Sequence, residues 1–184
     1  MRNHFIVACL GLAVLSACGG DRGDGNTAAT SASTSGGKKP PANWNAVDAC
    51  KVIDGATYGG FVGKTVKSTS LALERESDGV TAATSQCSYE LSDGQRVTIM
   101  LRWSPINDNT EGAINAARDG LNATVKAFNG KVESVDGLGK AAYWVEIANS
   151  LNVFIGEDKF AIISVPASPS ARDQAIAIAR KLGA

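Results

Sequence analysis

Residues 86–103, QCSYELSDGQRVTIMLRW, carry the strongest signal for the fold. Apolar and polar side chains alternate over 86–91 and again over 96–103, and Ser92-Asp93-Gly94-Gln95 separates the two runs. Alternation with a period of two is typical of strands with one buried face, and Asp-Gly tolerates the positive φ of a tight turn. The stretch therefore predicts an antiparallel hairpin whose second strand has four side chains on one face: Val97, Ile99, Leu101 and Trp103.

The flanking segments predict further helices and strands. Before the hairpin we expect a helix over 45–53, a glycine-broken segment, and a strand over 65–74. After it we expect a helix over 109–128, three strands over 141–147, 151–155 and 160–165, and a last helix that starts at Ser168-Pro169. The predicted class is α+β, with a largely antiparallel sheet and helices packed on one face.

The order of these elements also suggests an internal repeat. The stretch from Asp93 through the first long helix resembles the stretch from Glu157 to the end. Each has an apolar strand, then Ser and Pro, then an Ala/Ile-rich helix that closes near Ala-Arg. The pattern α-βββ-α-βββ-α therefore indicates a possible internal duplication.

The N-terminal segment indicates where the protein is located. Arg2 is followed by an apolar run over 5–15 and then by Leu15-Ser16-Ala17-Cys18. A basic start and 7–15 apolar residues are typical of a signal peptide, and the run is too short for a membrane-spanning helix, which needs about 20 residues. The last four residues resemble the lipobox of bacterial lipoproteins. An ordinary secretory cleavage is the alternative.

The lipobox resemblance implies removal of residues 1–17 and attachment of a diacylglyceryl group and a further acyl chain, such as palmitate, at Cys18. Two or more chains hold a protein stably at a membrane. In the sorting pattern of such proteins an Asp after the cysteine means retention at the inner membrane, so Gly19 favours the outer membrane. We expect a lipid-anchored protein of the cell envelope.

Composition divides the rest of the chain into a tether and one domain. Residues 18–43 contain almost no apolar side chain larger than alanine, so we expect a flexible tether, and we expect a single globular domain over 44–184. The chain has 18 basic and 18 acidic residues, and loss of Arg2 with the signal peptide leaves a net charge of −1. This near-neutral balance, with no basic cluster, argues against nucleic acid as a partner.

Cysteine usage predicts one disulfide. Once Cys18 is lipidated, Cys50 and Cys87 remain as an even pair in an oxidising compartment. We predict a structural Cys50–Cys87 bridge, with two separate buried thiols as the alternative. The chain has no Cys-x-x-Cys spacing that would indicate a redox site.

Four short segments of the expected domain carry a resemblance to a family: Asp48-Ala49-Cys50 with Val52-Ile53, Gly63-Lys64-Thr65-Val66, Cys87-Ser88-Tyr89, and residues 135–144, VDGLGKAAYW. They resemble a broad class of small bacterial lipoproteins whose extracytoplasmic domain has two disulfide-bonded cysteines and a Gly-Leu-Gly-x-x-Ala turn. The resemblance covers residues 44–184. It implies an architecture, and it implies no activity and no site residues.

Two glycine-rich segments could suggest phosphate or dinucleotide binding. In 59–65 a phosphate-binding loop would need glycine at Tyr58, and a strand is expected to follow, so a helix-to-strand turn is the better interpretation. Gly137-Leu138-Gly139 lacks the third glycine of a dinucleotide site and predicts a turn before the strand at Ala141. We expect no cofactor.

Few residues remain for catalysis. The one histidine, His4, lies in the expected signal peptide, which removes histidine-based triads and zinc sites. Carboxylate-only catalysis or calcium binding stays open, although the acidic residues show no EF-hand spacing: Asp108, Glu111, Asp119, Glu133, Asp136, Glu157 and Asp158. We predict no catalytic and no metal-ligating residue.

The best candidate for a ligand surface is aromatic: Trp103, Tyr143 and Trp144. Tyr143 and Trp144 are adjacent on an expected strand and therefore point to opposite faces, so packing in the core is the alternative role. We expect a non-enzymatic binding protein whose partner is an envelope protein, a glycan or a small molecule. The alternatives are a carboxylate-based extracytoplasmic enzyme and a pocketless inhibitory or assembly module that recognises its partner through a sheet edge.

Overall fold

The computed structural model describes residues 40–184, without the side chains of residues 73 and 74. The expected signal peptide, the lipidation site Cys18 and the expected tether up to residue 39 lie outside these residues. Trp44, where the expected domain starts, is buried, and its indole Nε1 donates to the Arg102 carbonyl oxygen at 3.3 Å. Within residues 40–184, no helix is both long enough and apolar enough to cross a membrane.

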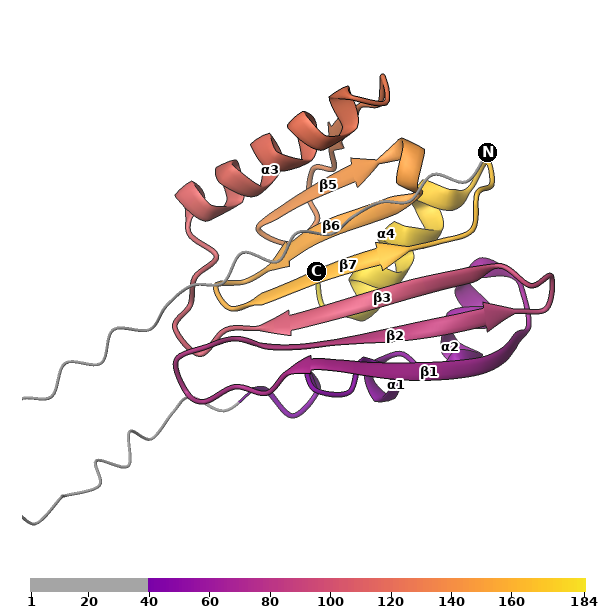
Figure 1. Cartoon of the computed structure of the whole chain (residues 1–184), viewed down its shortest axis with the longest axis horizontal. Coiled ribbons are helices and arrows are strands. Elements are labelled where there is room, and N and C mark those ends of the chain that lie inside the picture. The colour runs from indigo at the N-terminus through magenta and orange to yellow at the C-terminus, as the bar shows by residue number, and fades with distance from the viewer. Residues whose placement is uncertain (1–39) are drawn as a thin grey trace, which may run out of the picture. The chain divides into compact units, whose positions relative to one another are not determined.

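In the described part of the chain, seven strands form one antiparallel sheet, with four α-helices packed on it (Figure 1). The strand order is β1-β2-β3-β7-β6-β5-β4. This confirms the α+β class with a largely antiparallel sheet. In chain order the elements are α1 (Ala49–Val52), α2 (Gly55–Val62), β1 (Val66–Arg75), β2 (Ala83–Leu91), β3 (Arg96–Trp103), α3 (Glu111–Lys126), β4 (Val132–Ser134), β5 (Ala141–Val145), a 3₁₀ turn (Glu146–Ala148), β6 (Ser150–Ile155), β7 (Lys159–Ser164) and α4 (Ala171–Lys181).

The hairpin expected over residues 86–103 forms between β2 and β3. At its turn Gly94 has a φ of +83°, and the Asp93 carboxylate accepts a hydrogen bond from the Gln95 N–H at 3.0 Å. Burial alternates along both strands, and the expected apolar face of β3 is buried. Period-two alternation thus sets which face of this hairpin enters the core.

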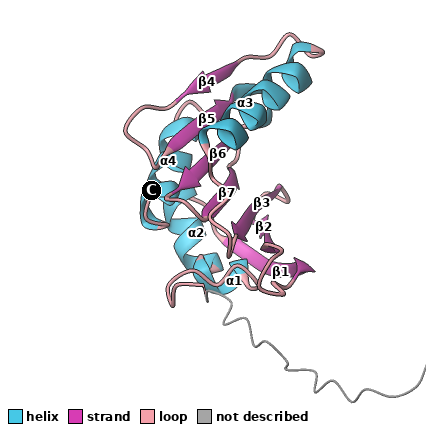
Figure 2. Ribbon diagram, turned by 90° about the vertical axis from the view of Figure 1, so that its left-hand side faces the viewer, coloured by secondary structure: helices cyan, strands magenta, loops and turns pink. Residues whose placement is uncertain are grey.

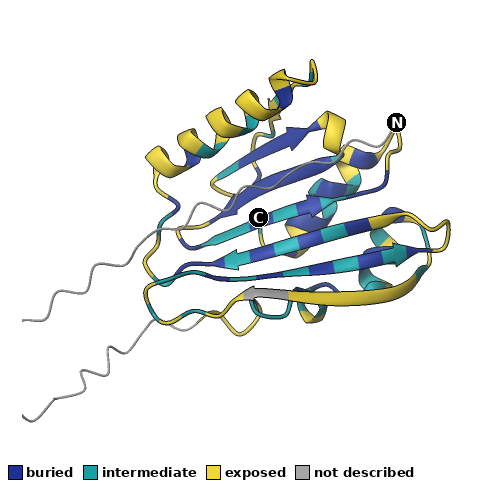
Figure 3. Cartoon of the chain, in the orientation of Figure 1, coloured by how far each residue is buried: buried dark blue, intermediate teal, exposed yellow. Residues whose placement is uncertain are grey.

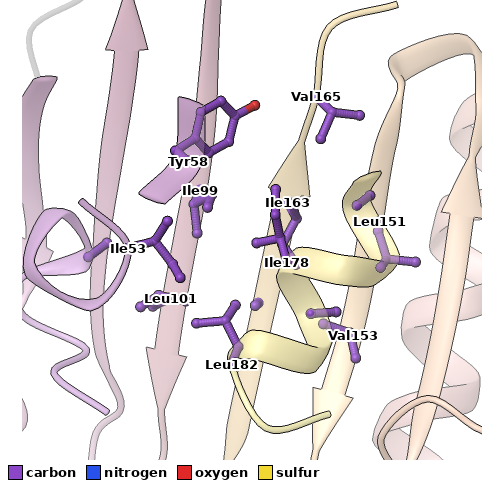
Figure 4. Packing of buried hydrophobic residues seen from close by; sticks show 14 of the residues in the cluster. Ile53, Tyr58, Ile99, Leu101, Leu151, Val153, Ile163, Val165, Ile178 and Leu182 are labelled. Atoms are coloured by element: carbon purple, nitrogen blue, oxygen red, sulfur yellow. The ribbon is translucent and has the colours of Figure 1, made fainter. Parts of the chain in front are cut away.

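The main core lies between the sheet and the three helices α1, α2 and α4 (Figures 2 and 4). Tyr58 of α2 stacks on Tyr89 of β2, with ring centroids 4.2 Å apart. The Tyr58 hydroxyl donates to the Ser164 carbonyl at 2.7 Å, and the Tyr89 hydroxyl donates to the Ile53 carbonyl at 2.6 Å. Burial raises the pKa of both hydroxyls, so both remain protonated donors that tie helices to strands.

The helix α3 packs on the opposite face of the sheet, over β4 to β6 (Figure 2). Its buried residue Ile114 contacts Tyr143 and Phe154 in a second, smaller core, which we call the α3 core. The expectation that all helices share one face is therefore wrong for α3. An apolar stripe shows which side of a helix is buried, but it does not show against which face of the sheet that side packs. The stripe also ends earlier than expected, because Phe128 is 71% exposed.

The internal duplication is not confirmed. β3 and β7 are central antiparallel neighbours, so a two-fold axis that relates them must run perpendicular to the sheet and preserve its faces. The helices that follow these two strands, α3 and α4, lie on opposite faces. The second half also has an additional strand, β4, which was not expected because it has only three residues.

The N-terminal helical region differs from the expected single helix over 45–53. Only Ala49–Val52 forms α1, and α2 forms where the glycines were expected to break the chain. The Asp54 side chain caps α2 by accepting the Thr57 N–H at 2.7 Å, and this bond lowers the pKa of Asp54. A cap and close packing against the sheet thus outweigh the low helix propensity of three glycines.

The predicted disulfide is confirmed. Cys50 of α1 and Cys87 of β2 are bonded, with their Cα atoms 4.9 Å apart and a sequence separation of 37 residues. Closing a loop of this length in the unfolded chain is worth about 4 kcal/mol in the chain-entropy account. The bridge therefore fastens α1 to the sheet next to β1.

Candidate functional site

The sheet ends in two edge strands that differ in length and exposure. β1 has 10 residues, and β4 has 3. Residues 67–72 are all exposed, and Figure 3 shows this part of β1 in yellow. Among residues 40–184, β1 pairs with β2 alone, so alternate N–H and C=O groups on its outer side lack a partner strand.

The central part of β1 has a regular register and no charged side chain. Register shifts lie between Val66 and Ser68 and between Leu73 and Arg75, and residues 68–73 pair one to one with β2 between them. Bulges and charged side chains are the devices by which proteins keep sheet edges from pairing with other chains. In β1 these devices lie at the two ends, so residues 68–73 remain open to an additional strand.

A groove of about 640 Å³ lies beside β1, between its first half and α2. We call it the α2–β1 groove: glycines of α2 line one side, and residues 64–69 line the other. A Cβ on Gly59 would lie 2.6 Å from the Lys64 carbonyl oxygen, so the turn that folds the chain back from α2 into β1 requires glycine there. A Cβ on Gly60 would meet no atom within 4 Å, so the backbone of α2 is open to the groove at this point.

The charged residues that line the groove are both lysines. Lys64 Nζ lies 2.5 Å from Asp93 Oδ2 and 3.3 Å from Gln95 Oε1, and its hydrogen bond holds the pKa of Asp93 below the usual range. Lys67 forms no ion pair with any residue of the described range. The groove therefore presents one compensated and one uncompensated positive charge.

The aromatic residues predicted as a ligand surface are buried instead. Trp103, Tyr143 and Trp144 are 1%, 6% and 5% exposed, so they form no aromatic surface. Trp103 Nε1 donates to the buried Asp158 carboxylate at 3.1 Å. Tyr143 packs in the α3 core and Trp144 in the main core, so these neighbours do point to opposite faces. Their core role, the alternative considered above, is the one that the structure assigns.

The acidic residues do not gather into a catalytic arrangement. Asp108 is held by the Arg102 guanidinium and Glu157 by Lys140 Nζ at 2.6 Å. Residues 40–184 contain no group of three or more His, Cys, Asp or Glu side chains placed to hold a metal ion. Every described carboxyl group whose pKa departs from its ordinary value is shifted downward: Asp54, Asp78, Asp93 and Asp108. A general acid at neutral pH needs the opposite shift.

Sequence reasoning named a sheet edge only in general terms and missed Gly60 and Lys67. The strand over 65–74 was predicted, but its edge position depends on the pairing of β3 with β7, which no local pattern reveals. The Gly-Gly-x-x-Gly-Lys run predicts a helix-to-strand turn over 59–65, but residues 59–62 belong to α2, and the turn between α2 and β1 is confined to residues 63–65. The available signal was the uncharged run STSLAL over 68–73, between Lys67 and residues 74–75.

Comparison with known proteins gives no relative: no family model, curated protein or solved structure matches this chain.

Proposed function

We propose that this protein is a lipid-anchored binding protein of the bacterial cell envelope whose domain takes up an extended segment of a partner polypeptide along the free edge of β1. The anchor rests on Leu15-Ser16-Ala17-Cys18, and Gly19 favours the outer membrane. The observation that carries the binding role is the uncharged, regularly paired segment 68–73 at an exposed edge. An added strand would satisfy the free main-chain groups of β1 and extend the sheet.

A polypeptide is favoured over a glycan because of what lies at the surface. The tryptophans and tyrosine that could stack on a sugar ring are buried, whereas the exposed feature is a row of main-chain donors and acceptors. An enzymatic role has no comparable support, since Asp108 and Glu157 are held by basic side chains and the described carboxyl groups whose pKa departs from its ordinary value are all shifted toward stronger acidity.

In-cell photo-crosslinking tests this proposal. A benzophenone amino acid at Ser70, on β1, is compared with the same probe at Asn122, an exposed position of α3. We expect one discrete protein adduct from position 70 and none from position 122. Identical adducts from both positions, or none from position 70, would contradict the proposal.

Single prolines sharpen the test, because successive N–H groups of a strand point alternately toward its neighbour and away from it. Of Ser70→Pro and Leu71→Pro, one removes an N–H that pairs with β2 and the other removes a free N–H. With the probe placed at Ser68 in both proline variants, we expect the variant that keeps the higher melting temperature to lose the crosslinked partner. If that variant retains the adduct, the edge of β1 does not bind the partner.

The anchor has its own test. Cys18→Ser should move the protein from the membrane fraction to the soluble fraction of the envelope, since the lipid attachment is lost. A Cys18→Ser protein that stays with the membrane would contradict the lipobox interpretation.

A further inference from the structure

The α2–β1 groove shares its residues with the free edge, and this determines what an added strand would meet. Val66, Lys67, Ser68 and Thr69 belong both to β1 and to the groove lining. Side chains of an added strand alternate between the two faces of the sheet. Those on the helix side would therefore enter the groove and face α2.

The shape of the groove favours close contact with α2. Gly59 is fixed as glycine by the Lys64 carbonyl, and Gly60 adds a stretch of helix backbone that no side chain of the described residues covers. An entering side chain can thus reach the helix surface at Gly60. A bulky residue at this position would fill the space that the partner needs.

The charge of the groove favours an acidic occupant. Of the described residues, Lys64 and Lys67 line it and no Asp or Glu does. Of these two lysines, only Lys64 has an ion-pair partner within residues 40–184, namely Asp93. A carboxylate brought beside Lys67 would compensate a charge for which the salt bridges among residues 40–184 include no partner. Charge complementarity of this kind sets specificity and register more than bulk affinity.

We infer, on the basis of the proposed function, that the partner is an extended polypeptide segment with a carboxylate beside Lys67 and an adjacent side chain seated against α2 at Gly60. The carboxylate belongs either to an Asp or Glu side chain or to the C-terminus of the partner. In both cases the segment pairs with residues 68–73, and Lys67 sets its register.

Selection from random decapeptides tests the inference directly. The full lipid-free domain is used to select from two displayed libraries, one with the peptide inserted internally and one with a free C-terminus. We expect selected peptides to lose binding to whichever of Ser70→Pro and Leu71→Pro keeps the fold, and to carry a carboxylate at a fixed position. Enrichment in the internal library assigns the carboxylate to a side chain, and enrichment confined to the other library assigns it to the C-terminus.

Two pairs of variants then measure the contributions of Lys67 and Gly60 by calorimetric titration of a selected peptide. Lys67→Glu should weaken binding about tenfold or more, whereas Lys126→Glu, which changes an exposed lysine of α3, should leave it within about twofold. Gly60→Leu should weaken binding by a similar factor, whereas Gly120→Leu, at a helical glycine of α3 with equally open space, should not. The melting temperature of each variant shows whether it folds.

The possible failures separate the two proposals. Peptides that depend on the β1 edge but tolerate Lys67→Glu and Gly60→Leu would overturn this inference and leave the proposed function in place. A selection that yields no edge-dependent peptide from either library would overturn both.

Discussion

The two edges of the sheet are built in opposite ways. β4 has three residues, contains the charged Glu133 and follows Lys131, and α3 packs over it. β1 has 10 residues, its central six are uncharged, and no strand of residues 40–184 pairs with its outer side. A sheet edge that is not meant to pair is short, charged or covered. The comparison shows that this fold protects one edge and leaves the other available.

The interiors behind these edges differ as well. β6 is buried at every position, because the main core lies on one face and the α3 core on the other. Behind β1, helices cover one face, and the disulfide fastens α1 to β2. The half of the sheet that ends in β4 is thus stabilised by packing on both faces, and the half that ends in β1 is stabilised by the disulfide. Substitutions in each half of the sheet should therefore act differently on stability.

Removal of the disulfide should weaken the half of the molecule with the open edge. We expect the double substitution Cys50→Ser and Cys87→Ser to lower the free energy of unfolding by about 4 kcal/mol, because the unfolded chain gains the entropy of an open loop. Urea unfolding with and without reductant measures this loss. A loss below about 1 kcal/mol would show that the bridge does not support this half of the sheet.

Truncation in the α3 core should weaken the half with the protected edge. Phe154 lies against Phe160, with ring centroids 4.7 Å apart, and edge-on to Tyr143 at 6.5 Å. We expect Phe154→Ala to cost about 3 kcal/mol, because it removes buried contacts and leaves a cavity. As the control, Phe128→Ala removes a ring that is 71% exposed and should change stability by less than about 0.5 kcal/mol. Equal losses for both variants would contradict the second core.

Two adjacent glycines of α2 should respond to alanine with opposite signs. Gly60→Ala should stabilise the fold by roughly 0.5–1 kcal/mol, since alanine favours the helix and meets open space. Gly59→Ala should destabilise it, because its Cβ would clash with the Lys64 carbonyl oxygen. Thermal unfolding of the two variants compares them directly. If both variants changed the melting temperature in the same direction, the close contact between Gly59 and the Lys64 carbonyl would be contradicted.

The smallest expected effect is a change in pH dependence at the Lys64–Asp93 pair beside the groove. Lys64 lowers the pKa of Asp93, so the carboxylate stabilises the fold above its ordinary pKa of about 3.9, and this contribution is lost as the pH falls through the lowered value. Asp93→Asn should therefore flatten the fall of melting temperature between about pH 5 and pH 2. If the melting temperature of this variant fell with pH as steeply as that of the unchanged protein, the Lys64–Asp93 pair would make no contribution to stability.

Local sequence patterns predicted the individual helices and strands, but they could not predict which distant strands pair with each other. The β2–β3 hairpin, the α3 stripe from Ile114 to Val125 and the Cys50–Cys87 bridge follow from alternation, helical spacing and an even cysteine count. The strand order does not, because it depends on β3 meeting β7 across 55 or more intervening residues of chain. The face that α3 covers and the burial of Trp103 depend on the same long-range choice.

The candidate site was the hardest part to predict for the same reason. No local pattern distinguishes Gly60, Lys67 or residues 68–73 as a site. Residues 68–73 form an edge because β1 is the last strand of the sheet, and Gly60 and Lys67 line a groove because α2 lies beside β1. The glycine-rich segment did not predict α2, because glycine has a low helix propensity. The cap at Asp54 and the packing of Gly59 outweigh this low propensity.

Backbone amide exchange across residues 68–73 shows whether the outer edge of β1 is free and whether a peptide pairs with it. In the free domain, alternate amides of this segment should exchange rapidly because no strand of residues 40–184 pairs with the outer side of β1, while those that pair with β2 remain protected. A bound peptide should protect the rapidly exchanging amides and leave the amides of β4 unchanged. Uniform protection of residues 68–73 in the free domain, or no change on peptide binding, would contradict the account.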